Sequence, residues 1–102
     1  MASQRQIQSS DQKTEQVSIP PHSTEAEQAV LGGIMLSNQH WDGIAERVIA
    51  EDFYTFAHKA LFQTMEELMR NQTPIALITL YQDLNAKGIS DSVGGFPYIA
   101  DL

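Results

Sequence analysis

The chain has no cysteine among its 102 residues. Disulfide bonds and thiolate metal sites are therefore excluded, and this composition suits a reducing compartment. Long apolar runs are also missing, since no stretch approaches the roughly 20 residues that a membrane-spanning helix needs. The polar residues 1–12 lack the apolar centre of a secretory signal. We therefore expect a cytoplasmic protein that makes no membrane contact.

Basic side chains are scarce, with six lysines and arginines against thirteen aspartates and glutamates, which gives a net charge of −7. Residues 1–21 carry two of each sign, so the excess lies in residues 22–102, with four basic and eleven acidic side chains. Such a surface repels phosphate backbones, which disfavours nonspecific nucleic-acid binding by this chain alone. It suits a basic protein partner instead.

Catalytic motifs are missing too. The chain contains no G-x-x-x-x-G-K-[ST], G-x-G-x-x-G, H-E-x-x-H or G-x-S-x-G pattern. His22, His40 and His58 are isolated from one another and have no acid at ligand spacing, which disfavours a metal site. A packed or hydrogen-bonded imidazole is the better interpretation of His58. We expect no catalytic, cofactor-binding or metal-binding residue in this chain.

The N-terminal part predicts a disordered leader, residues 1–20, which is rich in glutamine and serine and has no hydrophobic periodicity. Pro20 and Pro21 close it, because they disfavour helix just before them. A helix is expected at 23–38. Ser23 and Thr24 both suit its cap, and Thr24 has capping-box spacing to Glu27.

This first predicted helix is almost wholly apolar at 29–36, so we expect it to be buried on nearly every side. It contains a glycine pair, Gly32 and Gly33. Each glycine in a helix interior costs about 1 kcal/mol relative to alanine. The pair therefore predicts a place where another helix approaches very closely.

Apolar residues at helical spacing predict four further helices, at 38–49, 57–70, 79–87 and 96–102. Asn38 suits the cap of the second helix and Asp52 that of a short turn before the third, and Thr79 has capping-box spacing to Gln82. Gly88 is a C-terminal stop, and Pro97 fits the first turn of the last helix. The apolar residues 75–78 are too few to assign.

No segment alternates with the period of a strand. The pattern predicts an all-α fold, an orthogonal bundle of five to six short helices with a disordered N-terminal tail. The folded domain should span residues 21–102. Its last helix has no stop signal, so we expect the chain to be cut from a longer protein.

The last predicted helix carries the candidate partner-binding residues Phe96, Tyr98 and Ile99. Two roles fit them: they cover the end of the bundle, or some are exposed as anchors for a partner. Trp41 fits the core better than an interface.

Four blocks of the chain resemble a known family. They are PPHSTEAEQAVLGGIML (20–36), EDFYTFAHKALF (51–62), PIALITL (74–80) and DSVGGFPYIADL (91–102). In this order and spacing they are similar to the N-terminal domain of the DnaB-type bacterial replicative helicases. The sequence departs from the family at Ala76, where an acidic residue is usual.

The resemblance implies an all-helical head followed, in the whole protein, by a helical hairpin, a linker and a RecA-like ATPase domain that binds ATP and Mg²⁺. The whole protein would be a hexameric ring that unwinds duplex DNA at the bacterial replication fork. The head domains would associate as dimers to form its collar and dock the DnaG-type primase. The present chain would stop before the hairpin and have no catalytic activity.

Two other functions remain as alternatives. The collar could contact single-stranded DNA directly, and only Arg47, Lys59, Arg70 and Lys87 could serve that purpose in the body of the domain. A small stand-alone enzyme is the other, and no motif supports it.

Overall fold

The computed structural model describes residues 23–102, so the leader predicted for residues 1–20 lies outside the described residues. The described part contains five α-helices and three short 3₁₀ helices, labelled η, and no strand. In chain order they are α1 (Thr24–Leu36), η1 (Asn38–His40), α2 (Trp41–Ala45), η2 (Ala50–Asp52), α3 (Phe56–Arg70), α4 (Leu77–Ala86), η3 (Asp91–Val93) and α5 (Gly95–Ala100). The all-α prediction is confirmed. Within residues 23–102 no helix has the length and hydrophobicity to cross a membrane.

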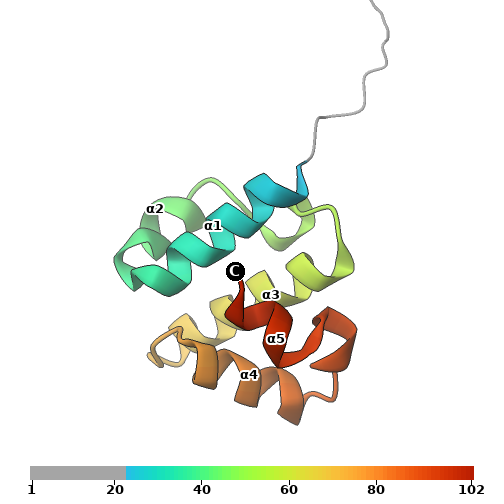
Figure 1. Cartoon of the computed structure of the whole chain (residues 1–102). Coiled ribbons are helices and arrows are strands. Elements are labelled where there is room, and N and C mark those ends of the chain that lie inside the picture. The colour runs from blue at the N-terminus through green and yellow to red at the C-terminus, as the bar shows by residue number, and fades with distance from the viewer. Residues whose placement is uncertain (1–22) are drawn as a thin grey trace, which may run out of the picture.

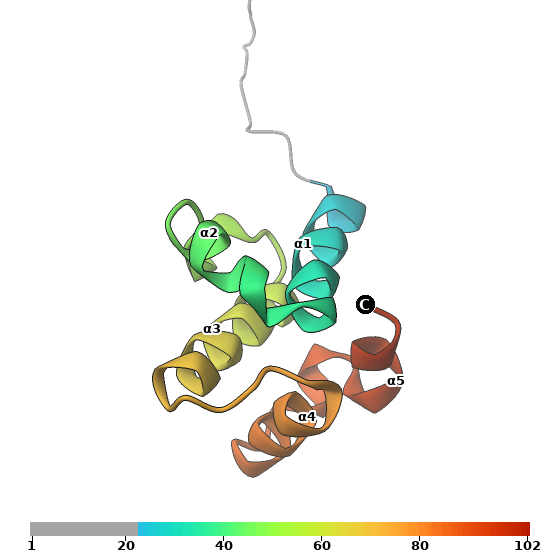
Figure 2. The ribbon, with the colours of Figure 1, turned by 90° about the vertical axis from the view of Figure 1, so that its left-hand side faces the viewer.

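The longest helix, α3, lies in the middle of the bundle. Figures 1 and 2 show α1 and α2 on one side of it and α4 and α5 on the other. It contacts α1, α4, η2 and η3. Seven of its side chains are buried, and they recur at the spacing of a helix that packs on more than one side.

One hydrophobic core joins the five α-helices with η2 and η3, whereas η1 contributes no buried residue. Phe62 of α3 lies at its centre, with its ring centroid 5.1 Å from that of Trp41 and 5.2 Å from that of Phe53. The other apolar core residues are Leu31, Ile34, Ala50, Ala60, Leu61, Met65, Leu68, Ile75, Leu80, Leu84, Val93 and Ile99. The prediction that Trp41 belongs to the core is confirmed.

Helix α1 begins with Ser23 as its cap, because the Ala26 amide donates to the Ser23 hydroxyl at 3.1 Å. Thr24, the other candidate cap, is the first residue inside the helix, so Glu27 forms no capping box with it. The Glu27 carboxylate instead accepts a bond from the Tyr54 amide, 27 residues away, at 2.8 Å. The Glu27 side chain therefore binds a distant part of the chain and not the start of its own helix, where the local pattern had placed it.

The expectation that α1 is buried on nearly every side is also wrong. Only Leu31 and Ile34 are buried, and Leu36 is 88% exposed. The glycine pair does mark a close approach, but to the end of the chain. A Cβ on Gly32 would lie 2.8 Å from the carbonyl carbon of Leu102, whereas a Cβ on Gly33 would meet nothing within 4 Å.

The second predicted helix, 38–49, is much shorter in the structure. It is divided into η1 and the five-residue α2, and the chain leaves helical geometry before Ile49. Ile49 is 56% exposed, although the apolar repeat placed it on the buried face. Asn38, expected as a cap, instead forms two hydrogen bonds with the backbone of Ile75, at 2.8 and 2.9 Å. This brace fixes the end of α1 against the segment that leads into α4.

The remaining helix ends lie within two residues of their predicted positions. Thr79, predicted as the cap of α4, lies in its first turn and accepts from the Ala76 amide at 2.9 Å. Gly88 ends α4 with φ of 75°, as expected of a C-terminal stop.

Candidate partner-binding surface

A buried polar network joins α1, α3 and α5. His58 of α3 is 1% exposed, and its Nδ1 lies 2.7 Å from Oε1 of Glu27. Its Nε2 lies 2.6 Å from the hydroxyl of Tyr98, which also accepts from the Gln28 amide at 3.0 Å. The rings of His58 and Tyr98 stack at 6.0 Å with 19° between their planes.

One assignment of protons satisfies this network. A neutral His58 donates from Nδ1 to Glu27 and accepts the Tyr98 O–H at Nε2, and the Tyr98 oxygen accepts from Gln28. Buried polar atoms are stable when each finds such a partner. The network holds three helices together, and the prediction of a hydrogen-bonded His58 is confirmed.

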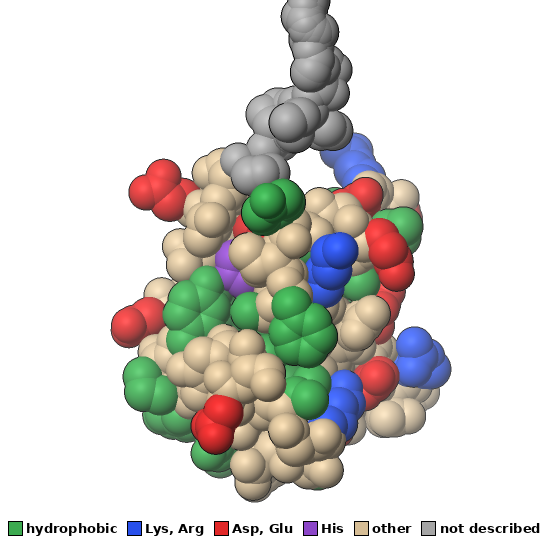
Figure 3. All heavy atoms as spheres, turned by 90° about the vertical axis from the view of Figure 1, so that its right-hand side faces the viewer, with side chains coloured by type: hydrophobic (Ala, Val, Ile, Leu, Met, Phe, Trp, Pro, Cys, Tyr) green, Lys and Arg blue, Asp and Glu red, His purple; other side chains and the backbone are tan. Residues whose placement is uncertain are grey.

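Aromatic side chains gather on the face beside this network. Phe56 is 60% exposed and Phe96 is 42% exposed, and the Phe96 ring packs edge-on against Tyr81 at 5.2 Å. Figure 3 shows hydrophobic side chains grouped on this face, over the start of α3 and around α5. We use the name aromatic face for the contacting pair Tyr81 and Phe96, on α4 and α5, together with the exposed Phe56 at the start of α3. Exposed aromatic groups of this kind are typical of protein–protein interfaces.

The three predicted interface residues have different positions. Phe96 is exposed, as an anchor requires. Tyr98 is half-buried and its hydroxyl is bound within the network. Ile99 is fully buried, so of the two expected roles it fits the covering of the bundle end, and it offers no accessible surface to a partner. Helix α5 packs on α4 and η3, and Ile99 belongs to the hydrophobic core that these elements share.

The four basic residues of the domain lie on different elements. Arg47 follows α2, Lys59 and Arg70 belong to α3, and Lys87 ends α4. Lys87 is engaged by carboxylates, at 2.7 Å from Glu67 and 3.4 Å from Asp83. Among residues 23–102 no group of histidine and carboxylate side chains is arranged to hold a metal ion.

Sequence reasoning missed the partners of His58. Glu27 and Tyr98 lie 31 and 40 positions away from it in the chain. Helical spacing relates only residues three or four apart, so it carries no signal for such contacts. In the sequence, Glu27 was visible only as an acid of the first helical turn and as a candidate capping-box residue.

The sequence model of the DnaB-like helicase N-terminal domain matches residues 19–102. The chain belongs to this family. Its first helix, the GGFPYIADL segment with Phe96 and the helical bundle are thus features of a DnaB-like N-terminal domain. The resemblance inferred from the four sequence blocks is confirmed.

Relatives that carry this domain are much longer than the present chain. It is 76% identical over 102 residues to the replicative DNA helicase DnaB of Haemophilus influenzae, matching all of this chain and 22% of that protein. Identity to the protein of the same name from Pasteurella multocida is 54% over 88 residues, 86% of this chain and 19% of that one. The present chain therefore spans about a fifth of the length of these helicases.

A solved structure has the same architecture. The crystal structure of the N-terminal domain of DnaB helicase from Mycobacterium tuberculosis matches with a TM-score of 0.78 and 32% sequence identity. The match covers 81% of this chain and 59% of that one. The helical bundle described above is therefore the fold of the DnaB N-terminal domain.

Proposed function

We propose that this chain is the non-catalytic N-terminal interaction domain of a hexameric replicative DNA helicase. In this role it associates with other copies in the collar of the ring and docks a DnaG-type primase. The observation that carries the proposal is the aromatic face, where Phe56 and Phe96 are exposed on a domain of this family. Large aromatic side chains that remain exposed commonly form the centre of an interface.

The rest of the helicase would supply the chemistry. The chain matches only 22% of its H. influenzae relative, which leaves most of that protein for an ATPase domain that binds ATP and Mg²⁺. The whole protein would unwind duplex DNA at the replication fork of a bacterial cytoplasm. The head domain would contribute assembly and primase recruitment, and no catalytic group.

Charge favours a protein partner over direct contact with single-stranded DNA. The net charge of −7 opposes phosphate binding, and Lys87 is already paired with two carboxylates. The alternative function, a collar surface that binds single strands, requires affinity that falls steeply with salt concentration.

Two measurements test the proposal. Sedimentation should show concentration-dependent association of the chain, and titration with the C-terminal domain of a DnaG-type primase should shift amide signals on the aromatic face. Phe96→Ala should weaken at least one of these interactions, whereas Leu36→Ala, at an even more exposed apolar position elsewhere, should weaken neither. A chain that stays monomeric and shows no shifts with primase would contradict the proposal.

A further inference from the structure

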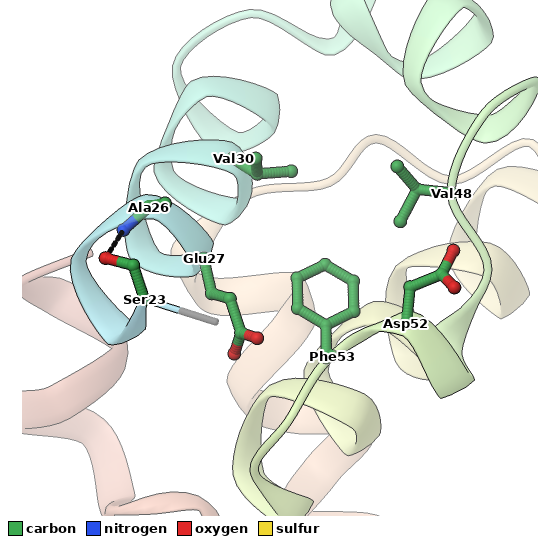
Figure 4. A pocket seen from close by; sticks show the side chains of 7 residues that line it. All are labelled: Ser23, Ala26, Glu27, Val30, Val48, Asp52 and Phe53. Carbon is green, nitrogen blue, oxygen red and sulfur yellow. Dashed lines mark hydrogen bonds between the residues drawn. The ribbon is translucent and has the colours of Figure 1, made fainter. Parts of the chain in front are cut away.

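A groove separate from the aromatic face lies between α1 and the segment from α2 to η2. It consists of two adjoining hollows of ≈ 250 and ≈ 510 Å³, which share Val30 and Val48 in their walls. We call it the α1–α2 groove. Its apolar lining comprises Ala26, Val30, Ile44, Val48 and Phe53. In Figure 4, Val30 and Val48 point toward one another, and the Phe53 ring lies between Glu27 and Asp52.

The dimensions of the groove match a helix. Ser23, Ala26, Glu27 and Val30 line it, at positions i, i+3, i+4 and i+7 of one face of α1. Seven residues of helix span about 10 Å, which is two turns of an opposing helix. Residues 23–102 contain no strand and so no sheet edge for an extended peptide to join. Laying an amphipathic helix into an apolar groove is a common mode of peptide recognition, and it fits these dimensions.

The charges around the groove select its occupant. The carboxylates of Glu27, Asp52 and Glu46 line it, against one cation, Arg47. The chain as a whole carries a charge of −7. At this groove, phosphate groups would be repelled, and so would an acidic surface of a second copy of the chain.

From this combination we infer that the α1–α2 groove docks a basic amphipathic helix of a partner protein. Apolar side chains on one face of that helix occupy the two hollows beside Val30 and Val48. Lysine or arginine side chains that flank the apolar stripe pair with Glu46 and Asp52. The inference does not depend on the aromatic face or on the proposed function.

A synthetic helical peptide tests the inference. It carries leucine at i, i+3, i+4 and i+7 and lysine on both flanks. Added to the whole chain, it should bind saturably and shift the amide signals of α1, α2 and η2. Two control peptides should bind at least tenfold more weakly: one with the same composition in scrambled order, and one with glutamate in place of lysine.

Matched charge variants locate the binding site. Glu46→Lys, on the rim of the groove, should weaken binding about five- to tenfold, since an exposed charge pair contributes up to about 1 kcal/mol and its reversal adds repulsion. Asp91→Lys makes the same change in net charge on exposed η3 and should change affinity less than twofold. Val48→Lys should abolish binding by placing a charge between the two hollows. Circular dichroism checks that the Val48→Lys variant is folded. If that variant is unfolded, the comparison of Glu46→Lys with Asp91→Lys decides whether the peptide binds in the groove.

Several results would overturn the inference. Equal binding of the scrambled peptide, equal effects of Glu46→Lys and Asp91→Lys, or shifts confined to the aromatic face would each do so. Self-association that Val48→Lys abolishes would assign the groove to a second copy. Changed groove signals after deletion of residues 1–19 would assign it to the chain's own N-terminal segment.

Discussion

Tyr98 shows how one hydroxyl group can decide whether a residue belongs to a surface or to the core. Its ring lies near the aromatic face, but its hydroxyl bonds to both His58 and Gln28. His58 in turn reaches Glu27, whose side chain is only 12% exposed. Removal of the hydroxyl therefore leaves a buried imidazole nitrogen without its partner. This loss should lower the stability of the fold, independently of any contribution that Tyr98 makes to binding.

We predict that Tyr98→Phe lowers the free energy of unfolding by about 1–2 kcal/mol, the penalty for one buried unsatisfied polar atom. Urea denaturation followed by circular dichroism measures it. Tyr81→Phe is the matched control, because Tyr81 packs on Phe96 through its ring and this contact does not use the hydroxyl. Equal stability of the two variants would mean that the network contributes nothing to the fold.

The two neighbouring glycines of α1 have different surroundings: Gly32 is tightly packed, and Gly33 faces open space. A methyl group on Gly32 would press on the backbone of Leu102, whereas one on Gly33 would meet nothing within 4 Å. We predict that Gly32→Ala lowers the free energy of unfolding by about 1–3 kcal/mol, as overpacking does. Gly33→Ala should raise it by up to about 1 kcal/mol through helix propensity. Thermal unfolding of both variants checks the signs, and a gain in stability from Gly32→Ala would refute the contact.

At the scale of the element, α3 and α4 end in the same way with different residues. In α3 the Thr73 amide bonds to the Leu68 carbonyl at 2.8 Å, and in α4 the Ile89 amide bonds to that of Leu84 at 3.0 Å. The left-handed residue before each bond is Gln72, with φ of 58°, and Gly88, with φ of 75°. Glycine adopts this conformation without strain, whereas a residue with a Cβ carries a penalty of about 1–2 kcal/mol.

The two helix ends therefore predict opposite effects. Gln72→Gly should raise the free energy of unfolding by about 1 kcal/mol, reduced in part by the greater freedom of glycine in the unfolded chain. Gly88→Ala should lower it by a similar amount, about 1 kcal/mol. Both residues are exposed, and a Cβ on Gly88 would meet nothing within 4 Å, so other contacts change little. Chemical denaturation of the two variants measures the pair, and effects of the same sign would contradict the argument.

Local sequence signals predicted the helices well where a local cause fixes them. Ser23, Gly88 and the apolar repeat of α3 lie close to their expected places because capping, left-handed glycine and helical period depend on nearby residues only. The failures involve tertiary partners. The Glu27 side chain bonds to His58 instead of closing a capping box, and the Asn38 side chain bonds to the backbone of Ile75 instead of capping a helix. A buried hydrogen bond to a partner distant in the chain outweighs the local capping preference of these residues.

At the scale of the whole molecule, the domain presents two different surfaces over one core. The aromatic face lies over the start of α3 and around α5, and the acidic apolar groove lies along α1 and α2. The sequence grouped Phe96 and Ile99 as candidate interface residues because both are apolar residues of the last predicted helix. Only the packing of α5 on α4 separates them, which the sequence of a six-residue helix does not reveal.

These two residues therefore give opposite predictions for stability and association. Ile99→Ala removes a fully buried side chain and should lower the free energy of unfolding by about 2–5 kcal/mol. Phe96→Ala removes an exposed ring and its contact with Tyr81, so the loss of stability should stay near 0.5–1.5 kcal/mol, or about the value of one aromatic pair. Association with other copies or with primase should be weakened more by Phe96→Ala than by Ile99→Ala, since Phe96 is accessible and Ile99 is not. Calorimetric melting and sedimentation, run on both variants, separate the roles. A Phe96→Ala variant that melts as early as Ile99→Ala would assign Phe96 to the core and remove the anchor from the aromatic face.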